Sequence, residues 1–263
     1  MIEDWLLTAD YEFMLRQKKA HIISVEPEYP LMPESSGKDL ENVVRLFCSW
    51  VSDHLERRLR SFNPFFSVDW SRLSIFGESF GAYPAMHFWV NLKRVVHKPE
   101  LQIRGMILRW PLVGDYKRAW GPYCGRDFPL ELSAQLLQNV SELHKSTSIL
   151  VRRAGQEPPN GMPFSWASSI HGVWSTWFDA RTVFDVIQET STCPGNETAF
   201  YITHGTHDKL VPYQSSIKLK AVLEKTWPGM KVSLILQEGR DHGWDYGQPL
   251  TDAYTAVLDQ FCA

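Results

Sequence analysis

Short runs of apolar and β-branched residues alternate with longer amphipathic patterns along most of this chain. Candidate strands lie at residues 21–25, 73–76, 103–109, 199–203 and 231–237. Candidate helices lie at residues 38–60, 80–96, 214–225 and 251–261. Consecutive parallel strands need a long crossover between them, usually a helix, so this alternation is typical of a parallel sheet covered by helices. The sequence therefore predicts an α/β fold with a mostly parallel sheet flanked by helices.

The length and composition predict one globular domain, residues 1–263. The hydrophobic share is 44% and the charged share 22%, which are ordinary values for a globular protein. Residues 114–194 separate two candidate strands by too long a stretch for one crossover, and they are rich in tryptophan. We expect a partly helical lid inserted there, at about 114–194. The alternative is that these tryptophans fill an irregular core.

Charge, cysteines and the first residues exclude several classes of protein. The net charge of -3, with both signs interspersed, offers no basic face for nucleic acid. The four cysteines lie far apart without C-x-x-C spacing, so neither a zinc cluster nor a dense disulfide framework is expected. No metal and no cofactor are expected. No run reaches transmembrane length, and the acidic start of the chain is a poor signal peptide, so we expect a cytoplasmic protein without a membrane span.

A G-x-S-x-G pentapeptide lies between a candidate strand and a candidate helix. It reads Gly77-Glu78-Ser79-Phe80-Gly81. In this context the motif makes a sharp turn that exposes the serine hydroxyl at the carboxyl edge of the sheet. The helix that follows directs its backbone N–H groups and its positive dipole end at the same place, so the Phe80 N–H is a predicted oxyanion donor. We therefore predict that Ser79 is a nucleophile.

Two partners for this serine follow in the order that such chemistry requires. A serine hydroxyl needs a histidine base, which is itself oriented by a carboxylate. Asp208 comes just after the strand at 199–203, and His242 just after the strand at 231–237. Carboxyl ends of parallel strands meet at one edge, so the three side chains are expected to converge there.

Other polar residues near these motifs are given lesser roles. His204 and His207 have no companion ligands for a metal, and we expect His204 to support the loop. Asp241 is adjacent to His242 and cannot orient it. Glu78 is either a spacer in the turn or, like Trp244, a pocket residue.

Several blocks of the sequence resemble the hormone-sensitive-lipase-like branch of the α/β-hydrolase superfamily. Residues 24–34 (SVEPEYPLMPE) look like the family's strand followed by D-Y-R-L-A-P-E, the pentapeptide at 77–81 like its G-D-S-A-G, and His242-Gly-Trp like its H-x-F. The resemblance spans nearly the whole chain. It implies the α/β-hydrolase fold, with Ser79 as nucleophile, Asp208 as acid and His242 as base.

The chain departs from this family at its N-terminal side. The family's His-Gly-Gly-Gly loop, which donates backbone N–H groups to the oxyanion, has no counterpart here. A strand that lies between those at 21–25 and 73–76 in the family is missing with it, so the fold is expected to be N-terminally shortened. Either these two strands pair directly, or another segment or a second chain fills the gap, because a gap within a sheet leaves backbone groups unpaired. A homodimer is one such expectation.

Three functions are compatible with this pattern. The first is a serine hydrolase that cleaves an apolar carboxylic ester, or a related acyl compound, through an acyl-enzyme. The second is non-hydrolytic chemistry on a hydrophobic metabolite, such as acyl transfer, a lyase reaction or cyclisation. The third is a truncated, catalytically impaired binding protein. Aromatic richness favours an apolar small-molecule substrate.

Overall fold

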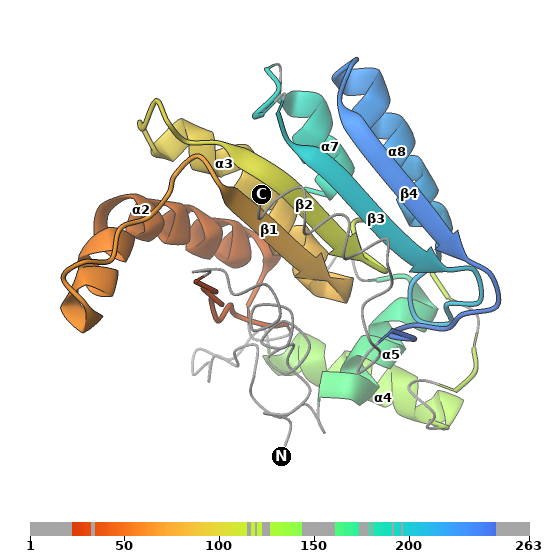
Figure 1. Ribbon diagram of the computed structural model, residues 1–263. Helices are drawn as coiled ribbons and strands as arrows, with labels where there is room; N and C mark the ends of the chain where they lie inside the picture. Colours follow the sequence, from red (N-terminus) through yellow and green to blue (C-terminus); the bar gives the residue numbers. More distant parts are fainter. Residues whose placement is uncertain are drawn as a thin grey trace.

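The computed structural model describes residues 23–32, 35–114, 117–118, 120–122, 127–143, 161–173, 179, 181–190, 192–195 and 197–245. Within them, one sheet contains β1 (Leu73–Glu78), β2 (Ile103–Arg109), β3 (Ala199–Gly205) and β4 (Lys231–Gln237). All neighbours pair in parallel, in the order β1-β2-β3-β4 (Figure 1). All four carboxyl ends therefore lie at the same edge. The predicted parallel α/β architecture is confirmed.

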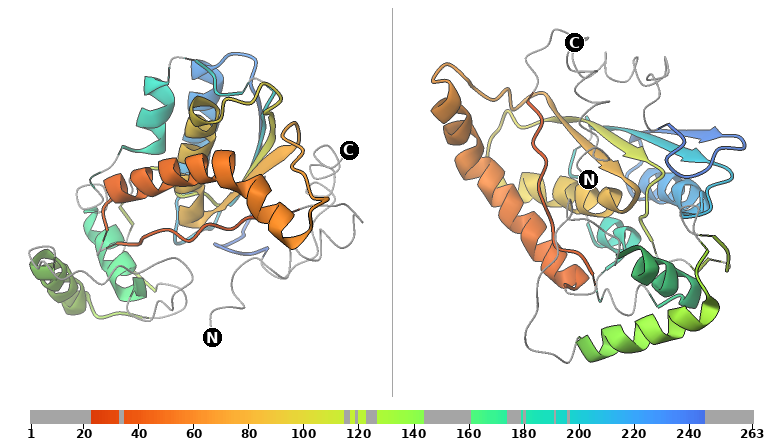
Figure 2. Two further views of the ribbon diagram at one scale, coloured as in Figure 1. Left: turned by 90° about the vertical axis from the view of Figure 1, so that its left-hand side faces the viewer. Right: turned by 90° about the horizontal axis from the view of Figure 1, so that it is seen from below.

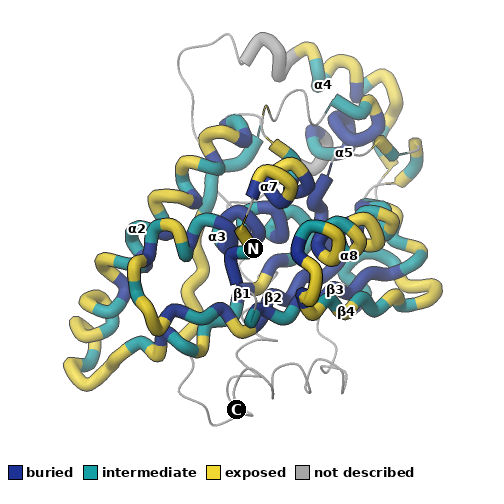
Figure 3. The backbone as a smooth tube through the Cα atoms, turned by 90° about the horizontal axis from the view of Figure 1, so that it is seen from above, coloured by how far each residue is buried: buried dark blue, intermediate teal, exposed yellow. Residues whose placement is uncertain are grey.

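The helices predicted at 38–60, 80–96 and 214–225 are present, and the segment 114–194 contains further helices. They are α2 (Gly37–Phe62), the short 3₁₀ turn η1 (Ser79–Gly81), α3 (Ala82–Val95), α4 (Leu130–Leu143), α5 (Gly161–His171), α7 (Val183–Glu189) and α8 (Gln214–Thr226). α3, α7 and α8 cover one face of the sheet, and α2 packs against α3 (Figures 1 and 2). Figure 3 shows that the buried backbone is concentrated in the inner strands and α3, while α2 and α8 turn exposed residues outward.

Local signals explain where several elements begin. Ser36 caps α2 and Thr182 caps α7, each in a reciprocal capping box with the acidic residue three positions later. β2 is buried at six of its seven positions, which suits a parallel strand with neighbours on both sides. These caps and apolar runs were readable from the sequence, so the predicted bounds of α2, α8, β2 and β4 agree with the structure to within two residues.

The predicted strand at 21–25 is wrong for its described part. Residues 23–29 are not in a strand, and Ile23 and Val25 are 45% and 39% exposed. A β-branched run becomes a strand only when a neighbour pairs with it, so propensity alone was insufficient. Direct pairing with β1, one of the alternatives left open, is absent from the described residues, where β1 is an edge strand. The predicted helix at 251–261 lies outside the described residues.

The segment predicted as a lid has two kinds of helix. α7 contributes Val183, Phe184 and Ile187 to the main core, so it is a crossover helix between β2 and β3. α4 and α5 pack against each other around a small separate cluster that includes Trp166 and Ile170. That a lid covers the site remains a prediction.

Candidate active site

Ser79 lies in a strained turn directly after β1. Its φ of 49° is in the left-handed region, which costs a non-glycine residue about 1–2 kcal/mol. Gly77 makes this turn sterically feasible, since a Cβ at this position would lie only 2.7 Å from the Cα atom of Ala82. The Ser79 carbonyl accepts a hydrogen bond from the Leu112 N–H at 2.9 Å. The turn therefore presents the serine hydroxyl at the carboxyl edge of the sheet, ahead of α3.

His242 and Asp208 reach this serine from the loops that follow β4 and β3. His242 Nε2 lies 3.0 Å from Ser79 Oγ, and His242 Nδ1 lies 2.7 Å from Asp208 Oδ2. The Asp208 side chain is fully buried, whereas that of His242 is 12% exposed. The structure thus brings together all three residues that the sequence nominated, joined by two hydrogen bonds.

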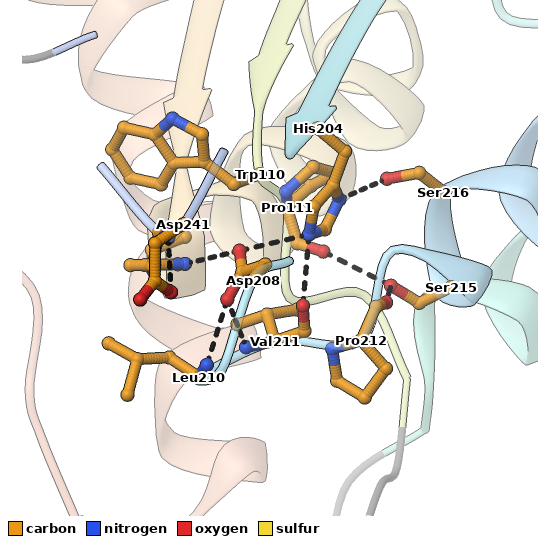
Figure 4. A network of polar contacts seen from close by, with 12 residues as sticks. Trp110, Pro111, His204, Asp208, Leu210, Val211, Pro212, Ser215, Ser216 and Asp241 are labelled. Atoms are coloured by element: carbon orange, nitrogen blue, oxygen red, sulfur yellow. Dashed lines mark hydrogen bonds and ion pairs between the residues drawn. The ribbon is translucent and has the colours of Figure 1, made fainter. Parts of the chain in front are cut away.

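Asp208 is held by more groups than His242 alone. Its Oδ1 accepts hydrogen bonds from the backbone N–H groups of Leu210 and Val211, both at 2.8 Å. Its Oδ2 also lies 3.0 Å from His204 Nε2 (Figure 4). Burial by itself would raise the pKa of Asp208, but hydrogen bonds from His204 and His242 outweigh it and hold that pKa well below its usual value. Asp208 is therefore a carboxylate at neutral pH.

His204 supports Asp208 from behind, and its contacts define its tautomer. Nε2 faces two acceptors at 3.0 Å, the Asp208 carboxylate and the Val211 carbonyl, so it carries the proton. Nδ1 lies 2.7 Å from Ser216 Oγ on α8 and accepts from that hydroxyl (Figure 4). The expectation that His204 supports its loop is confirmed.

Asp241 ties the loop of the base to the loop of the acid. Its Oδ1 accepts hydrogen bonds from the Lys209 N–H at 2.9 Å and from the His242 N–H at 2.8 Å. Behind it, the Arg240 carbonyl accepts from the His207 N–H at 3.0 Å. These bonds set the distance between the two loops that carry Asp208 and His242.

Glu78 and Trp244, the two suggested pocket residues, have other neighbours. Glu78 forms a buried ion pair with Arg109, 2.7 Å between Oε1 and Nη1, so it is more than a spacer in the turn. The guanidinium carbon of Arg240 lies over the Trp244 ring, 5.6 Å from the ring centroid. That either side chain contacts a substrate remains a prediction.

Aromatic rings surround the beginning of α3. The Phe80 ring stacks on Tyr83 with centroids 5.9 Å apart, and the Tyr29 ring makes a tilted contact with Phe80 at the same separation. The Tyr29 hydroxyl lies 3.9 Å from where a Cβ on Gly81 would be. An aromatic wall therefore borders the nucleophile turn.

Two features are absent from the described residues. No cluster of three or more histidine, cysteine or acidic side chains with the geometry to hold a metal ion was found among them. None of their helices is both long and apolar enough to cross a membrane.

No protein-family model matches the sequence, and no curated protein matches it either. Solved structures do match. An α/β hydrolase superfamily protein from Enterococcus faecalis superimposes with a TM-score of 0.50 at 10% identity, over 89% of this chain and 75% of that chain. This chain has the α/β-hydrolase fold.

Two named esterases are also among the matched structures of this fold. Esterase B from Lactobacillus rhamnosis, with a tributyrin phosphonate inhibitor, has a TM-score of 0.48 at 13% identity, over 89% of this chain and 62% of that chain. An esterase from Thermogutta terrifontis, with butyrate bound, has a TM-score of 0.42 at 16% identity, over 88% of this chain and 66% of that chain. This chain thus spans less than two thirds of either esterase.

Sequence reasoning missed three residues around this site, Arg109, Trp110 and Asp245, and it gave Asp241 no role. A charged residue ending a buried apolar strand was a usable signal for Arg109, because a buried charge needs a partner. No local pattern named that partner. Asp245 lies 136 positions further along the chain, and only the fold brings it to Arg109.

Proposed function

We propose that this protein is a serine hydrolase that cleaves a carboxylic ester or a related acyl compound, with Ser79 as nucleophile. The observation that carries the proposal is the continuous chain of hydrogen bonds from Ser79 Oγ to His242 and from His242 to Asp208, at 3.0 and 2.7 Å. The strained φ of Ser79 supports it, because strain at a polar residue in a cluster of this kind is typical of a functional site.

The reaction follows from these positions in two steps. His242 Nε2 takes the proton of Ser79 as Oγ attacks the acyl carbon, and then returns it to the departing alkoxide, which leaves as the alcohol. A water molecule, deprotonated by His242, then attacks the acyl-enzyme, and Ser79 regains its proton as the carboxylic acid is released. Asp208 keeps the proton of His242 on Nδ1 and stabilises the imidazolium that forms in both steps.

The acyl oxygen gains negative charge in both steps and needs hydrogen-bond donors. The Phe80 backbone N–H, at the beginning of α3, is our first assignment. Tyr29 is our second, since its hydroxyl lies beside Gly81 and makes no hydrogen bond to another described residue. Burial raises the pKa of Tyr29 to about 12, so the hydroxyl keeps its proton at neutral pH. In this proposal Tyr29 takes the place of the His-Gly-Gly-Gly loop.

A fluorophosphonate probe combined with an ester series tests the function. We expect the probe to label Ser79, and wild type to hydrolyse p-nitrophenyl esters with a preference along the acyl-length series. Ser79→Ala is expected to lose labelling and to lower kcat on the order of 10⁴-fold or more. Ser61→Ala, an exposed serine on α2, is the matched control and should behave as wild type. A folded wild type that the probe does not label, or equal hydrolysis by wild type and Ser79→Ala, would contradict the proposal.

A further inference from the structure

A buried cation contacts the segments that carry two of the proposed catalytic residues. Arg109 is the last residue of β2, a strand with neighbours on both sides, and its side chain is only 4% exposed. Its guanidinium contacts two carboxylates. Nη1 lies 2.7 Å from Glu78 Oε1, while Nε and Nη2 lie 3.0 and 2.9 Å from Oδ2 and Oδ1 of Asp245. We call Glu78, Arg109 and Asp245 the buried charge cluster.

The two carboxylates belong to the two segments that must meet for catalysis. Glu78 immediately precedes Ser79, and Asp245 follows His242 by three residues. Their side chains are 6% and 7% exposed. Arg109 therefore connects the turn of the nucleophile to the loop of the base.

Trp110 extends this cluster to the base itself. Its indole N–H donates a hydrogen bond to Asp245 Oδ1 at 2.8 Å, and its ring contacts the His242 ring with centroids 4.7 Å apart. Trp110 is fully buried and has a φ of 36°, an unusual backbone conformation for a bulky residue. Such a conformation persists only where the surroundings impose it, and the bond to Asp245 is one such constraint.

Stability is a weak explanation for a cluster of this kind. Removing charges from water costs free energy, and apolar replacements of a buried ion pair are often as stable as the original or more so. The bidentate contact of Arg109 with Asp245 does, however, define an orientation, because the planar guanidinium accepts few arrangements of a carboxylate. The geometry is better suited to holding two segments in register than to stabilising the fold.

We propose that Arg109 is a positioning residue which, through Glu78 and Asp245, holds Ser79 and His242 at reacting distance, with Trp110 fixing the imidazole ring. This inference rests on the proposed function. It implies that the charge cluster acts on kcat and leaves substrate binding unchanged. A displacement of about 1 Å between reacting groups can lower a rate about a hundredfold.

The decisive variant removes all three charges together, Glu78→Gln with Arg109→Met and Asp245→Asn, so that no uncompensated charge remains buried. We expect this neutral triple variant to fold, to lower kcat for a p-nitrophenyl ester about a hundredfold, and to leave KM within about twofold of wild type. A role in stability alone predicts wild-type kcat in a variant that folds. A folded triple variant with kcat within threefold of wild type would overturn the inference.

A second variant answers the question if the triple variant does not fold. Trp110→Phe keeps an aromatic ring against His242 but removes the N–H that bonds Asp245. We expect kcat to fall about tenfold with KM unchanged. Unchanged kcat in this folded variant, with the triple variant unfolded, would overturn the inference.

One measurement and one control variant separate this inference from the proposed function. The His242 Nδ1 proton, 2.7 Å from an Asp208 oxygen, should give a far-downfield proton NMR signal in the free protein, and we expect the signal to be lost or exchange-broadened in the variants. This signal needs no substrate, so it tests the positioning role even if no ester is hydrolysed. The matched control is Arg181→Met, since Arg181 also joins two carboxylates, those of Glu41 and Glu189, away from the site. It should leave both kcat and the signal as in wild type, and a signal unchanged in every variant would overturn the inference.

Discussion

Gly205→Ala tests how tightly the loops of the acid and the base are packed. Gly205 ends β3, and a Cβ there would lie 2.1 Å from the Arg240 carbonyl oxygen and 2.7 Å from its carbon. Ordinary contacts begin near 3.4 Å, so the two backbones must separate by more than 1 Å. The clash involves backbone atoms, which no rotamer change can relieve.

Arg240 is two residues before His242, so this separation displaces the base from Ser79. Because a displacement of about 1 Å can cost a hundredfold in rate, we expect kcat to fall by about that factor. The overpacking should also lower the free energy of unfolding by about 1–3 kcal/mol. The assay is steady-state hydrolysis of a p-nitrophenyl ester, together with the rate of fluorophosphonate labelling and denaturant unfolding.

Gly195→Ala is the control for overpacking alone. A Cβ there would lie 2.7 Å from the Thr198 Oγ1, close to the amino end of β3 and thus at the opposite end from the site. This variant should lose stability while keeping kcat. The reasoning is refuted if Gly205→Ala retains the kcat of wild type, or if both variants lose kcat to the same extent.

Three further outcomes are expected. Burial lowers the pKa of His87 to about 4, so the unfolded chain binds more protons than the folded chain below about pH 6.5. About 3 kcal/mol of the free energy of unfolding should therefore be lost as the pH falls from about 6.5 to about 4. In urea titrations at several pH values, His87→Phe should show a weaker dependence of the unfolding free energy on pH. Tyr29→Phe should lower kcat about a hundredfold at unchanged KM, and wild-type kcat would exclude its hydroxyl as an oxyanion donor. Asp208→Asn should lower kcat about 10⁴-fold. The pKa of Asp208 is depressed in the folded state, so the ionised carboxylate stabilises the fold above about pH 4, and this stabilisation is lost as the pH falls further. The free energy of unfolding of Asp208→Asn should lack that loss at acidic pH.

The sequence by itself determined four of the five predicted strands, their parallel pairing and the three residues of the proposed chemistry. β2 and β4 were predictable to the residue because each is a short apolar run, β2 followed by Pro111 and β4 lying between Gly229 and Gly239. Ser79, Asp208 and His242 were predictable because each follows a strand, and parallel strands end at one edge. Local composition is sufficient for such inferences, since every signal lies within a few residues of the element that it defines.

Tertiary structure alone decided which segments enter the sheet and what supports the site. Residues 23–25 have a strand-like composition, but strand formation depends on a pairing neighbour that composition does not specify. Glu78, Arg109 and Asp245 form one buried cluster although 31 and 136 positions separate the arginine from its partners. Gly205 matters only because the Arg240 backbone passes against it. Each of these contacts depends on how distant segments pack together, and a hydrogen bond or a steric clash is defined by distances that no local pattern encodes.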